Sequence, residues 1–394
     1  MKIAVLNETA ENENRVAASP ETIKKFVGLG AEVVVESNAG NGASFGDAIF
    51  KEAGASIAAS GQDAVQGADL ILKVRAPNSD ELRYLHKGQK VAAIVSPHNH
   101  PELIEASARA GIDVFAMDLM PRITRAQSMD VLSSQSNLAG YKAVIDAAAY
   151  YGRAMPMMMT AAGTVAPAKV FIMGAGVAGL QAIATARRLG AVVTATDVRF
   201  AAKEQVESLG ASFVTVDEDA MKNAETEGGY AKEMSDDFKA RQAEFVAEHI
   251  KKQNIVITTA LIPGRPAPEL VSEEMVRSMA AGSVLVDLAA EQGGNVALTR
   301  PGEAIDVNGV IVIGFENVAG RLPSDASSLY AKNLYNFVTA FHDKDAGVFK
   351  PDPDDEIIKG VQLTHDGKII HPAFISEDQA SAEAAEPASN EEEE

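Results

Sequence analysis

Short apolar runs alternate with amphipathic stretches along the first third of the chain. Apolar residues in continuous runs predict buried strands, and apolar residues three and four apart predict helices between them. Such alternation is typical of a parallel sheet covered on both faces. Ser19, followed by Pro20 and Glu21, marks the start of a helix. We expect strands at 2–7, 32–37, 70–75, 91–95 and 113–117, and helices at 19–30, 44–54 and 99–111.

A second alternating block runs from 169 to about 314. It predicts another parallel sheet, because helical periodicity again separates β-rich runs. Between the two blocks, the stretch 136–152 predicts a helix that connects two domains. Its expected apolar face consists of Leu138, Tyr141, Ile145 and Ala148. The strands of the second block are expected at 170–173, 192–197, 212–216, 254–260, 283–289 and 310–314.

The region after 320 predicts a return of the chain to the first domain. An amphipathic helix at 327–342 is expected to bury Leu329, Leu334, Phe337 and Val338. The stretch 356–370 predicts a β-hairpin around Asp366 and Gly367, two residue types that tolerate the positive φ of a tight turn.

Taken together, the pattern predicts an α/β protein with two Rossmann-like, doubly wound parallel-sheet domains and a cleft between them. The first domain is expected to be discontinuous, because the second is inserted into it. We place the first domain at 1–135 and 320–376 and the second at 136–319. The remaining segment, 377–394, has eight acidic residues, no basic residue and little to bury, so we expect a disordered acidic tail.

Composition narrows the functional classes. Hydrophobic residues make up 46% of the chain and charged residues 23%, as in a soluble globular protein. The formal net charge of −20 disfavours nucleic acid as a partner. Because cysteine is absent, disulfides, thiolate metal sites and thiol catalysis are excluded, which fits a reducing cytoplasm. Neither a signal peptide nor a membrane span is apparent in the sequence.

The most informative motif is a glycine fingerprint between a predicted strand and a predicted helix. Gly174 permits a tight turn, Gly176 allows close approach to a pyrophosphate, and Gly179 allows close helix–strand packing. Asp197 ends the next strand at the offset of a ribose-binding acid, which predicts NAD(H) rather than NADP(H). Arg199 leaves an alternative open, because an arginine there can receive a 2′-phosphate. A nucleotide-binding fold that has lost its ligand is the other alternative.

The segment PRITRAQSMDVLSSQSNLAGY at 121–141 resembles the NAD(H)-binding component of proton-translocating transhydrogenases, which are related to alanine dehydrogenases. The resemblance covers about 1–376 and includes RVAASP, GAGVAG, GGYAKEMS, TTALIPGRPAP and VDLAAEQGGN. It implies a dimer with NAD in the cleft that passes a hydride directly between NADH and NADP⁺. The NADP(H) would be held by a partner subunit, and a membrane-spanning partner would move protons. The chain itself would lie peripherally on the cytoplasmic face of the inner membrane.

The resemblance also implies which residues do the work. Four residues in 122–133 would orient the nicotinamide and its carboxamide, and their side chains can supply the required donors and acceptors: Arg122, Gln127, Asp130 and Ser133. Without the resemblance, this segment reads equally well as a polar loop with Ser133 or Ser134 as the cap of the following helix. Cofactor contacts are expected from Gly174, Ala175, Gly176, Val177, Gly179, Asp197, Val198, Arg199, Gly229, Tyr230, Ala260 and Leu261.

Two other functions are also compatible with the sequence. Arg15 and Lys73 match the residues with which alanine dehydrogenases bind substrate, but His98 lies in surroundings unlike those of the dehydrogenase histidine. The alternatives are therefore an alanine dehydrogenase-like enzyme and a non-catalytic NAD-sensing protein.

No metal site is expected. His98 and His100 lack further ligands nearby and read as surface histidines. The methionines Met155, Met157, Met158 and Met159 have no cysteine partner, so we interpret them as core or hinge packing.

Overall fold

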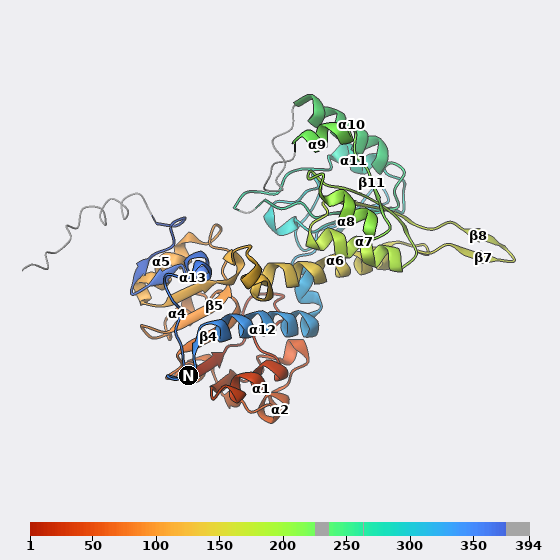
Figure 1. Ribbon diagram of the computed structural model, residues 1–394. Coiled ribbons are helices and arrows are strands. Elements are labelled where there is room, and N and C mark those ends of the chain that lie inside the picture. Colours follow the sequence, from red (N-terminus) through yellow and green to blue (C-terminus); the bar gives the residue numbers. More distant parts are fainter. Residues whose placement is uncertain (225–235, 263, 376–394) are drawn as a thin grey trace, which may run out of the picture. The chain divides into compact units, whose positions relative to one another are not determined.

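The computed structural model describes residues 1–224, 236–262 and 264–375. The chain forms two compact units (Figure 1). Unit 1 comprises Met1–Leu132 and the chain from Pro323 onward, and unit 2 comprises Ser133–Leu322. The sequence predicts domain boundaries after 135 and after 319, and the two units divide after Leu132 and after Leu322. The acidic tail, Gly229 and Tyr230 lie outside the described residues.

Unit 1 contains a six-stranded, all-parallel sheet in the order β3-β2-β1-β4-β5-β6. This is the order of a doubly wound dinucleotide-binding fold. The strands are β1 (Lys2–Val5), β2 (Glu32–Glu36), β3 (Ser56–Ala58), β4 (Leu70–Arg75), β5 (Lys90–Ile94) and β6 (Asp113–Ala116). The helices are α1 (Pro20–Gly28), α2 (Asp47–Glu52), α3 (Gly61–Ala64), α4 (Ser79–Leu82), α5 (Pro101–Ala110), α12 (Pro323–Ala340) and α13 (Glu356–Val361), with 3₁₀ turns η1 (Asn41–Ala43), η2 (Met117–Leu119) and η3 (Thr124–Met129).

Both faces of this sheet are buried, as its continuous apolar runs predict. Along β4, Leu70 and Leu72 pack into one cluster and Ile71 into the other. Helices α1 and α12 contribute to the first cluster, so the late helix does return to unit 1. Leu334, Phe337 and Val338 are fully buried in it, but Leu329 is 43% exposed, which corrects the expected core at that position.

Two local predictions in unit 1 have different outcomes. Ser19 caps α1 as expected, accepting a hydrogen bond from the Thr22 N–H with Pro20 in the first turn. The expected hairpin is shorter than predicted: it pairs only β18 (Thr364–His365) and β19 (Lys368–Ile369) around the positive-φ turn, and the stretch before it is helix α13. A second small hairpin joins β16 (His342–Asp343) and β17 (Val348–Phe349).

Unit 2 contains a seven-stranded sheet in the order β11-β10-β9-β12-β13-β15-β14, parallel except for the edge strand β14. Its strand order reverses direction between β9 and β12, where doubly wound sheets bind ligands. The strands are β9 (Lys169–Met173), β10 (Val192–Thr196), β11 (Ser212–Phe213), β12 (Ile255–Thr258), β13 (Val284–Asp287), β14 (Ala304–Val307) and β15 (Val310–Ile313). Helix α6 (Val131–Tyr150) begins with the last two residues of Met1–Leu132 and continues in unit 2. The other helices of unit 2 are α7 (Val177–Arg188), α8 (Ala202–Ser208), α9 (Glu218–Ala224), α10 (Asp236–Ile250) and α11 (Glu273–Ser278), with 3₁₀ turns η4 (Ala290–Gln292) and η5 (Val318–Arg321).

Helix α6 buries a face different from the one predicted. Gly140, Ala143, Val144 and Ala147 are buried, whereas Tyr141 is 40% exposed and Leu138, Ile145 and Ala148 are only partly buried. Small residues fill this face because α6 packs closely against neighbouring backbone. A search for large apolar residues therefore selects the wrong side.

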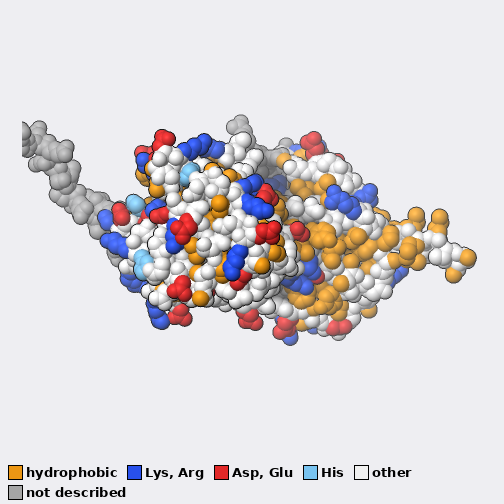
Figure 2. Space-filling view, turned by 90° about the horizontal axis from the view of Figure 1, so that it is seen from below, with side chains coloured by type: hydrophobic (Ala, Val, Ile, Leu, Met, Phe, Trp, Pro, Cys, Tyr) orange, Lys and Arg blue, Asp and Glu red, His pale blue; other side chains and the backbone are white. Residues whose placement is uncertain are grey.

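A two-stranded hairpin, β7 (Met158–Thr160) and β8 (Gly163–Val165), projects from unit 2 (Figure 1). Hydrophobic side chains cover much of this projection (Figure 2). Met155 is buried, but Met157, Met158 and Met159 are 59%, 42% and 78% exposed. The interpretation of these three methionines as core or hinge packing is therefore wrong.

Candidate functional site

The glycine turn between β9 and α7 is built as the fingerprint requires. Gly174 has a φ of +104°, and a Cβ atom there would lie 2.5 Å from Thr259 Oγ1. A Cβ on Gly179 would lie 1.8 Å from the carbonyl oxygen of Gly174, so only glycine lets α7 approach the turn this closely. At Gly176, by contrast, nothing lies within 4 Å of a Cβ position, which leaves open space beside the turn.

The first turn of α7 suits an anion. Gly176 is the N-cap of this helix, and no side chain caps the helix N-terminus. The N–H groups there point outward with the positive end of the helix dipole, the usual arrangement for binding a pyrophosphate. Val177, the first helical residue, is 41% exposed, whereas Ala175 is buried. These residues therefore fit a dinucleotide.

Asp197 and Arg199 form a tight pair next to the glycine turn. Asp197 Oδ2 accepts from the Ala175 N–H at 2.7 Å and from Arg199 Nη2 at 3.1 Å, and Oδ1 accepts from Arg199 N at 2.8 Å and Nε at 2.9 Å. Four donors match the capacity of a carboxylate. The Arg199 side chain is 41% exposed, and its hydrogen bond to Asp197 raises the pKa of the guanidinium. Val198, between them, is 73% exposed.

The loop after β12 is held by a buried side-chain amide that the sequence pattern does not predict. Asn295 is fully buried; its Oδ1 accepts from the Ala260 N–H at 3.0 Å, and its Nδ2 donates to the carbonyl oxygens of Ala260 at 2.9 Å and Pro268 at 2.8 Å. Asp287 in turn accepts from the Asn295 N–H at 2.8 Å. Leu261 is left 47% exposed beside this fixed backbone.

Asn295 and Asp287 both lie in a segment that carried the family resemblance, but no single-residue signal in the sequence marks them. Their role depends on which backbone groups they meet, and only the fold shows that. The sequence pattern does not mark Thr259 either: its hydroxyl donates to the Gly174 carbonyl at 3.1 Å, which ties the residue after β12 to the glycine turn.

The four residues expected to orient the nicotinamide are divided between the units. Arg122, Gln127 and Asp130 belong to unit 1, where Arg122 and Gln127 are exposed and Gln127 lies on η3. The η3 turn is anchored because the Asn333 and Asn336 amides both donate to the Ser128 carbonyl at 2.9 Å.

Ser133 belongs to unit 2. Because α6 begins at Val131, Ser133 and Ser134 lie inside its first turn. The interpretation of either serine as a cap is therefore wrong.

Arg15 and Lys73 are interior residues of unit 1. Lys73 is 1% exposed, with Nζ 2.7 Å from Glu81 Oε1 and 3.5 Å from Glu8 Oε2. Burial alone would lower the Lys73 pKa, but the Glu8 and Glu81 carboxylates raise it. Arg15 is 3% exposed and contacts Glu13 at 2.6 Å. Neither cation is available at the surface of unit 1 for a substrate carboxylate.

Glu13 is the acid at the centre of this buried cluster. It also accepts from Arg75 Nε at 2.9 Å. Burial alone would raise its pKa, but hydrogen bonds and charges from Arg15 and Arg75 lower it to about 2. The cluster therefore keeps its charges paired inside unit 1.

His98 and His100 both belong to unit 1, and each lies beside another side chain. The His98 ring lies 4.9 Å from that of Phe374, and His100 is more than half exposed near Glu102. No group of three potential metal-ligating His, Cys, Asp or Glu residues occurs among the described residues.

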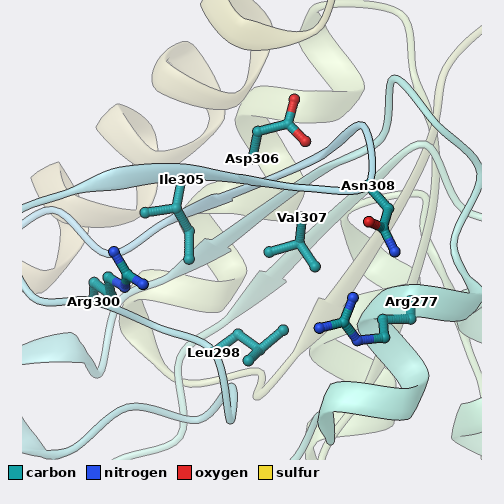
Figure 3. Close-up of a pocket in the computed structure, with 7 residues that line it drawn as sticks. All are labelled: Arg277, Leu298, Arg300, Ile305, Asp306, Val307 and Asn308. Atoms are coloured by element: carbon teal, nitrogen blue, oxygen red, sulfur yellow. The ribbon is translucent and has the colours of Figure 1, made fainter.

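A cavity of 370 Å³ lies along the edge strand β14 (Figure 3). Arg277 and Arg300 lie at its two ends, and Asp306 projects away from the apolar residues between them. Both arginines already contact acids, Glu273 at 2.6 Å and Glu303 at 3.7 Å. The cavity is lined by Arg277, Leu298, Arg300, Ile305, Asp306, Val307 and Asn308, none of which belongs to the predicted nucleotide site.

Comparison with known proteins identifies the class. Residues 4–139 match the family profile "Alanine dehydrogenase/PNT, N-terminal domain", and residues 143–372 match "Alanine dehydrogenase/PNT, C-terminal domain". The chain belongs to this family, and the resemblance inferred from the sequence is confirmed. The fold class is confirmed as well.

Particular relatives are closely similar. The chain is 53% identical to an NAD(P) transhydrogenase alpha-subunit polypeptide of Rhodospirillum rubrum over 96% of this chain and 100% of that protein. The transhydrogenase structure from Sinorhizobium meliloti is 53% identical with a TM-score of 0.86 and covers 94% of this chain and 100% of that one. An L-alanine dehydrogenase structure is 27% identical with a TM-score of 0.78, covering 98% and 100%. Within the described residues of the chain, no helix has the length and apolarity to cross a bilayer.

Proposed function

We propose that this chain is the NAD(H)-binding component of a proton-translocating NAD(P) transhydrogenase. The observation that carries the proposal is the turn after β9, where Gly176 borders open space and no side chain caps α7, in a chain 53% identical to a transhydrogenase subunit. In this proposal the first turn of α7 binds the pyrophosphate of NAD(H). A hydride then passes directly to NADP⁺ held by a partner subunit.

Discrimination between NAD(H) and NADP(H) is assigned to Asp197. Two of its four hydrogen bonds come from the Ala175 and Arg199 backbone N–H groups, and two come from the flexible Arg199 guanidinium. When the guanidinium turns away, two acceptor positions open, one for each ribose hydroxyl. A 2′-phosphate in the same place would meet the carboxylate charge and be repelled.

The bound nicotinamide supplies the hydride, and this chain's residues supply its orientation. Direct transfer moves no proton at the reacting carbons, so catalysis rests on positioning two rings at about 3–3.5 Å. Arg122, Gln127, Asp130 and Ser133 are assigned to the nicotinamide. Tyr230 and Gly229 are assigned as further nucleotide contacts, and so are Ala260 and Leu261.

The assembly belongs to the same proposal. We infer an NADP(H)-binding subunit and a membrane-spanning, proton-conducting subunit as partners, which hold the chain on the cytoplasmic face of the membrane. We also infer a homodimer. The exposed methionines of the β7–β8 hairpin support a contact between protein surfaces, because Met157–Met159 present a flexible apolar strip to solvent.

One experiment separates this proposal from the alternatives. The purified chain is assayed with NADH plus pyruvate and ammonia, and separately with NADH plus NADP⁺ before and after addition of the NADP(H)-binding partner. We expect no oxidation with pyruvate and transfer to NADP⁺ only with the partner present. Rapid pyruvate-dependent oxidation would show an alanine dehydrogenase-like enzyme, and NADH binding without transfer under any condition would show an NAD-sensing protein.

A further inference from the structure

A glycine outside the fingerprint brings a third stretch of backbone against the nucleotide turn. Gly140, buried in the middle of α6, lies against the first turn of α7. A Cβ atom on Gly140 would lie 2.0 Å from the Ala178 carbonyl oxygen, 2.8 Å from its carbonyl carbon and 2.9 Å from its Cα. Ordinary contacts between carbon atoms are about 3.5–4.0 Å. Because the neighbours are backbone atoms, no side chain can rotate to make room.

The first turn of α7 therefore makes two close backbone contacts. Gly179 lets it approach the turn that follows β9, as its 1.8 Å Cβ distance to the Gly174 carbonyl oxygen shows. Gly140 lets α6 approach the same first turn, with a Cβ distance of 2.0 Å to the Ala178 carbonyl oxygen. One turn along, Asn137 Nδ2 donates to Gln181 Oε1 at 3.4 Å, which adds a polar contact between the same two helices.

The face of α6 that meets α7 also carries Ser133. Seven residues separate Ser133 from Gly140 in one continuous helix. Seven residues are close to two full turns, so both positions lie on one face about 10 Å apart along the axis. Ser133, Gly140 and the first turn of α7 all belong to unit 2, where one helix thus links the residue assigned to the nicotinamide with the turn assigned to the pyrophosphate.

We propose that Gly140 is a positioning residue that fixes the distance between α6 and the first turn of α7 and so aligns the nicotinamide through Ser133. This inference rests on the proposed function, because it assumes that NAD(H) binds at α7. A methyl group at this position pushes α6 away by roughly 1.5 Å. Misplacement on the scale of 1 Å can reduce turnover about 100-fold. Because Gly179 keeps the first turn of α7 against the Gly174 turn, α6 is the element that moves, and the pyrophosphate turn is expected to stay in place.

The first test compares Gly140→Ala with Gly28→Ala. Gly28 is a helical glycine in α1 with nothing within 4 Å of its Cβ position, so it is a matched control for the added methyl group. We expect Gly140→Ala to lower the rate of hydride transfer to partner-bound NADP⁺ about 10- to 100-fold. Its Kd for NADH, measured by calorimetry, is expected to change less than about 5-fold, and Gly28→Ala is expected to match the unaltered chain.

Two double variants test the distance between α6 and α7 without inserting a buried atom. Asn137→Asp combined with Gln181→Glu places two carboxylates on facing positions at the surface, whereas Asn137→Asp combined with Gln181→Lys places opposite charges there. Repulsion is expected to slow transfer in the first pair at low salt and to be relieved at high salt, because salt screens exposed charges. The oppositely charged double variant should keep normal turnover. Dividing the transfer rate of one double variant by that of the other at each salt concentration removes any effect of salt on partner docking.

The outcomes separate this inference from the proposed function. If the unaltered chain does not bind NADH, the proposed function fails. If it binds and transfers normally, and Gly140→Ala and the like-charged pair do the same, the positioning role is overturned. Equal losses of affinity and turnover in Gly140→Ala would also overturn it, because they would show damage to the pyrophosphate turn alone.

Discussion

Replacing Asp197 with asparagine tests how the nucleotide is selected, because the side chain keeps its shape and loses its charge. Each carboxylate oxygen of Asp197 accepts from two donors, so the new NH₂ group faces donors in either orientation. The Arg199 guanidinium is then released from its pair. It becomes available to a 2′-phosphate, which the carboxylate no longer repels.

The size of the effect follows from the bonds involved. A hydrogen bond to a charged group contributes about 1.5–3 kcal/mol, which corresponds to roughly 10- to 100-fold in affinity. We therefore expect Asp197→Asn to weaken NADH binding about 10- to 100-fold and to strengthen NADPH binding. The ratio of the two affinities should shift by more than about 10-fold, since the two changes act in opposite directions.

Fluorescence titration with NADH and with NADPH, at one fixed ionic strength, measures both constants. Asp306→Asn is the matched control, because Asp306 also accepts a backbone N–H in unit 2, from Gly309 at 2.6 Å, but lies on β14. The control should bind both nucleotides as the unaltered chain does. Equal loss of NADH and NADPH affinity in Asp197→Asn would refute the selection argument.

Three further predictions address the orienting residues, the glycine turn and the buried charges. Gln127→Asn should reduce turnover more than NADH affinity, because a shorter side chain leaves the nicotinamide ring misaligned. Steady-state kinetics measured with the partner present test this, and normal turnover with a collapsed affinity would contradict the orienting role. Gly179→Ala should abolish detectable NADH binding by calorimetry, since its Cβ would lie 1.8 Å from the Gly174 oxygen; retained affinity would exclude the turn as the binding site. Glu13 has its pKa lowered to about 2 from 4.5, so the stability it contributes is fully present above pH 4.5 and is lost as the pH falls toward 2. Melting curves should show that loss of stability in the unaltered chain and a flatter pH dependence in Glu13→Gln. The variant should also be less stable at pH 7 by about 3–5 kcal/mol, because Arg15 loses its buried partner. Parallel pH profiles of the two proteins would contradict this prediction.

The sequence predicts elements well where one local pattern determines them. Parallel strands such as β4 and β9 are buried on both faces, so they appear as continuous apolar runs. Ser19 and Pro20 identify the start of α1 because capping is a local interaction. The tight turn at Asp366 and Gly367 is likewise local, and both residues have positive φ.

Prediction fails where long-range packing decides the structure. The buried face of α6 consists of Gly140, Ala143 and Ala147, because close backbone approach selects small residues that carry little hydrophobic signal. The sequence predicts a strand where α13 forms, because six residues are too few to distinguish the helical repeat from the two-residue repeat of a strand. In the site, the glycines and Asp197 are recognisable from spacing, but the amide of Asn295 becomes meaningful only once the fold brings Ala260 and Pro268 to it.

Deuterium labelling tests directly whether a hydride passes from NADH on this chain to NADP⁺ on a partner. NADH deuterated at the transferred C4 position is incubated with the chain, NADP⁺ and the partner in ordinary water, and the NADPH formed is analysed by mass spectrometry. We expect one deuterium in essentially every NADPH molecule and no product when the partner is omitted. NADPH without deuterium, or NADH oxidised by the chain alone, would contradict it.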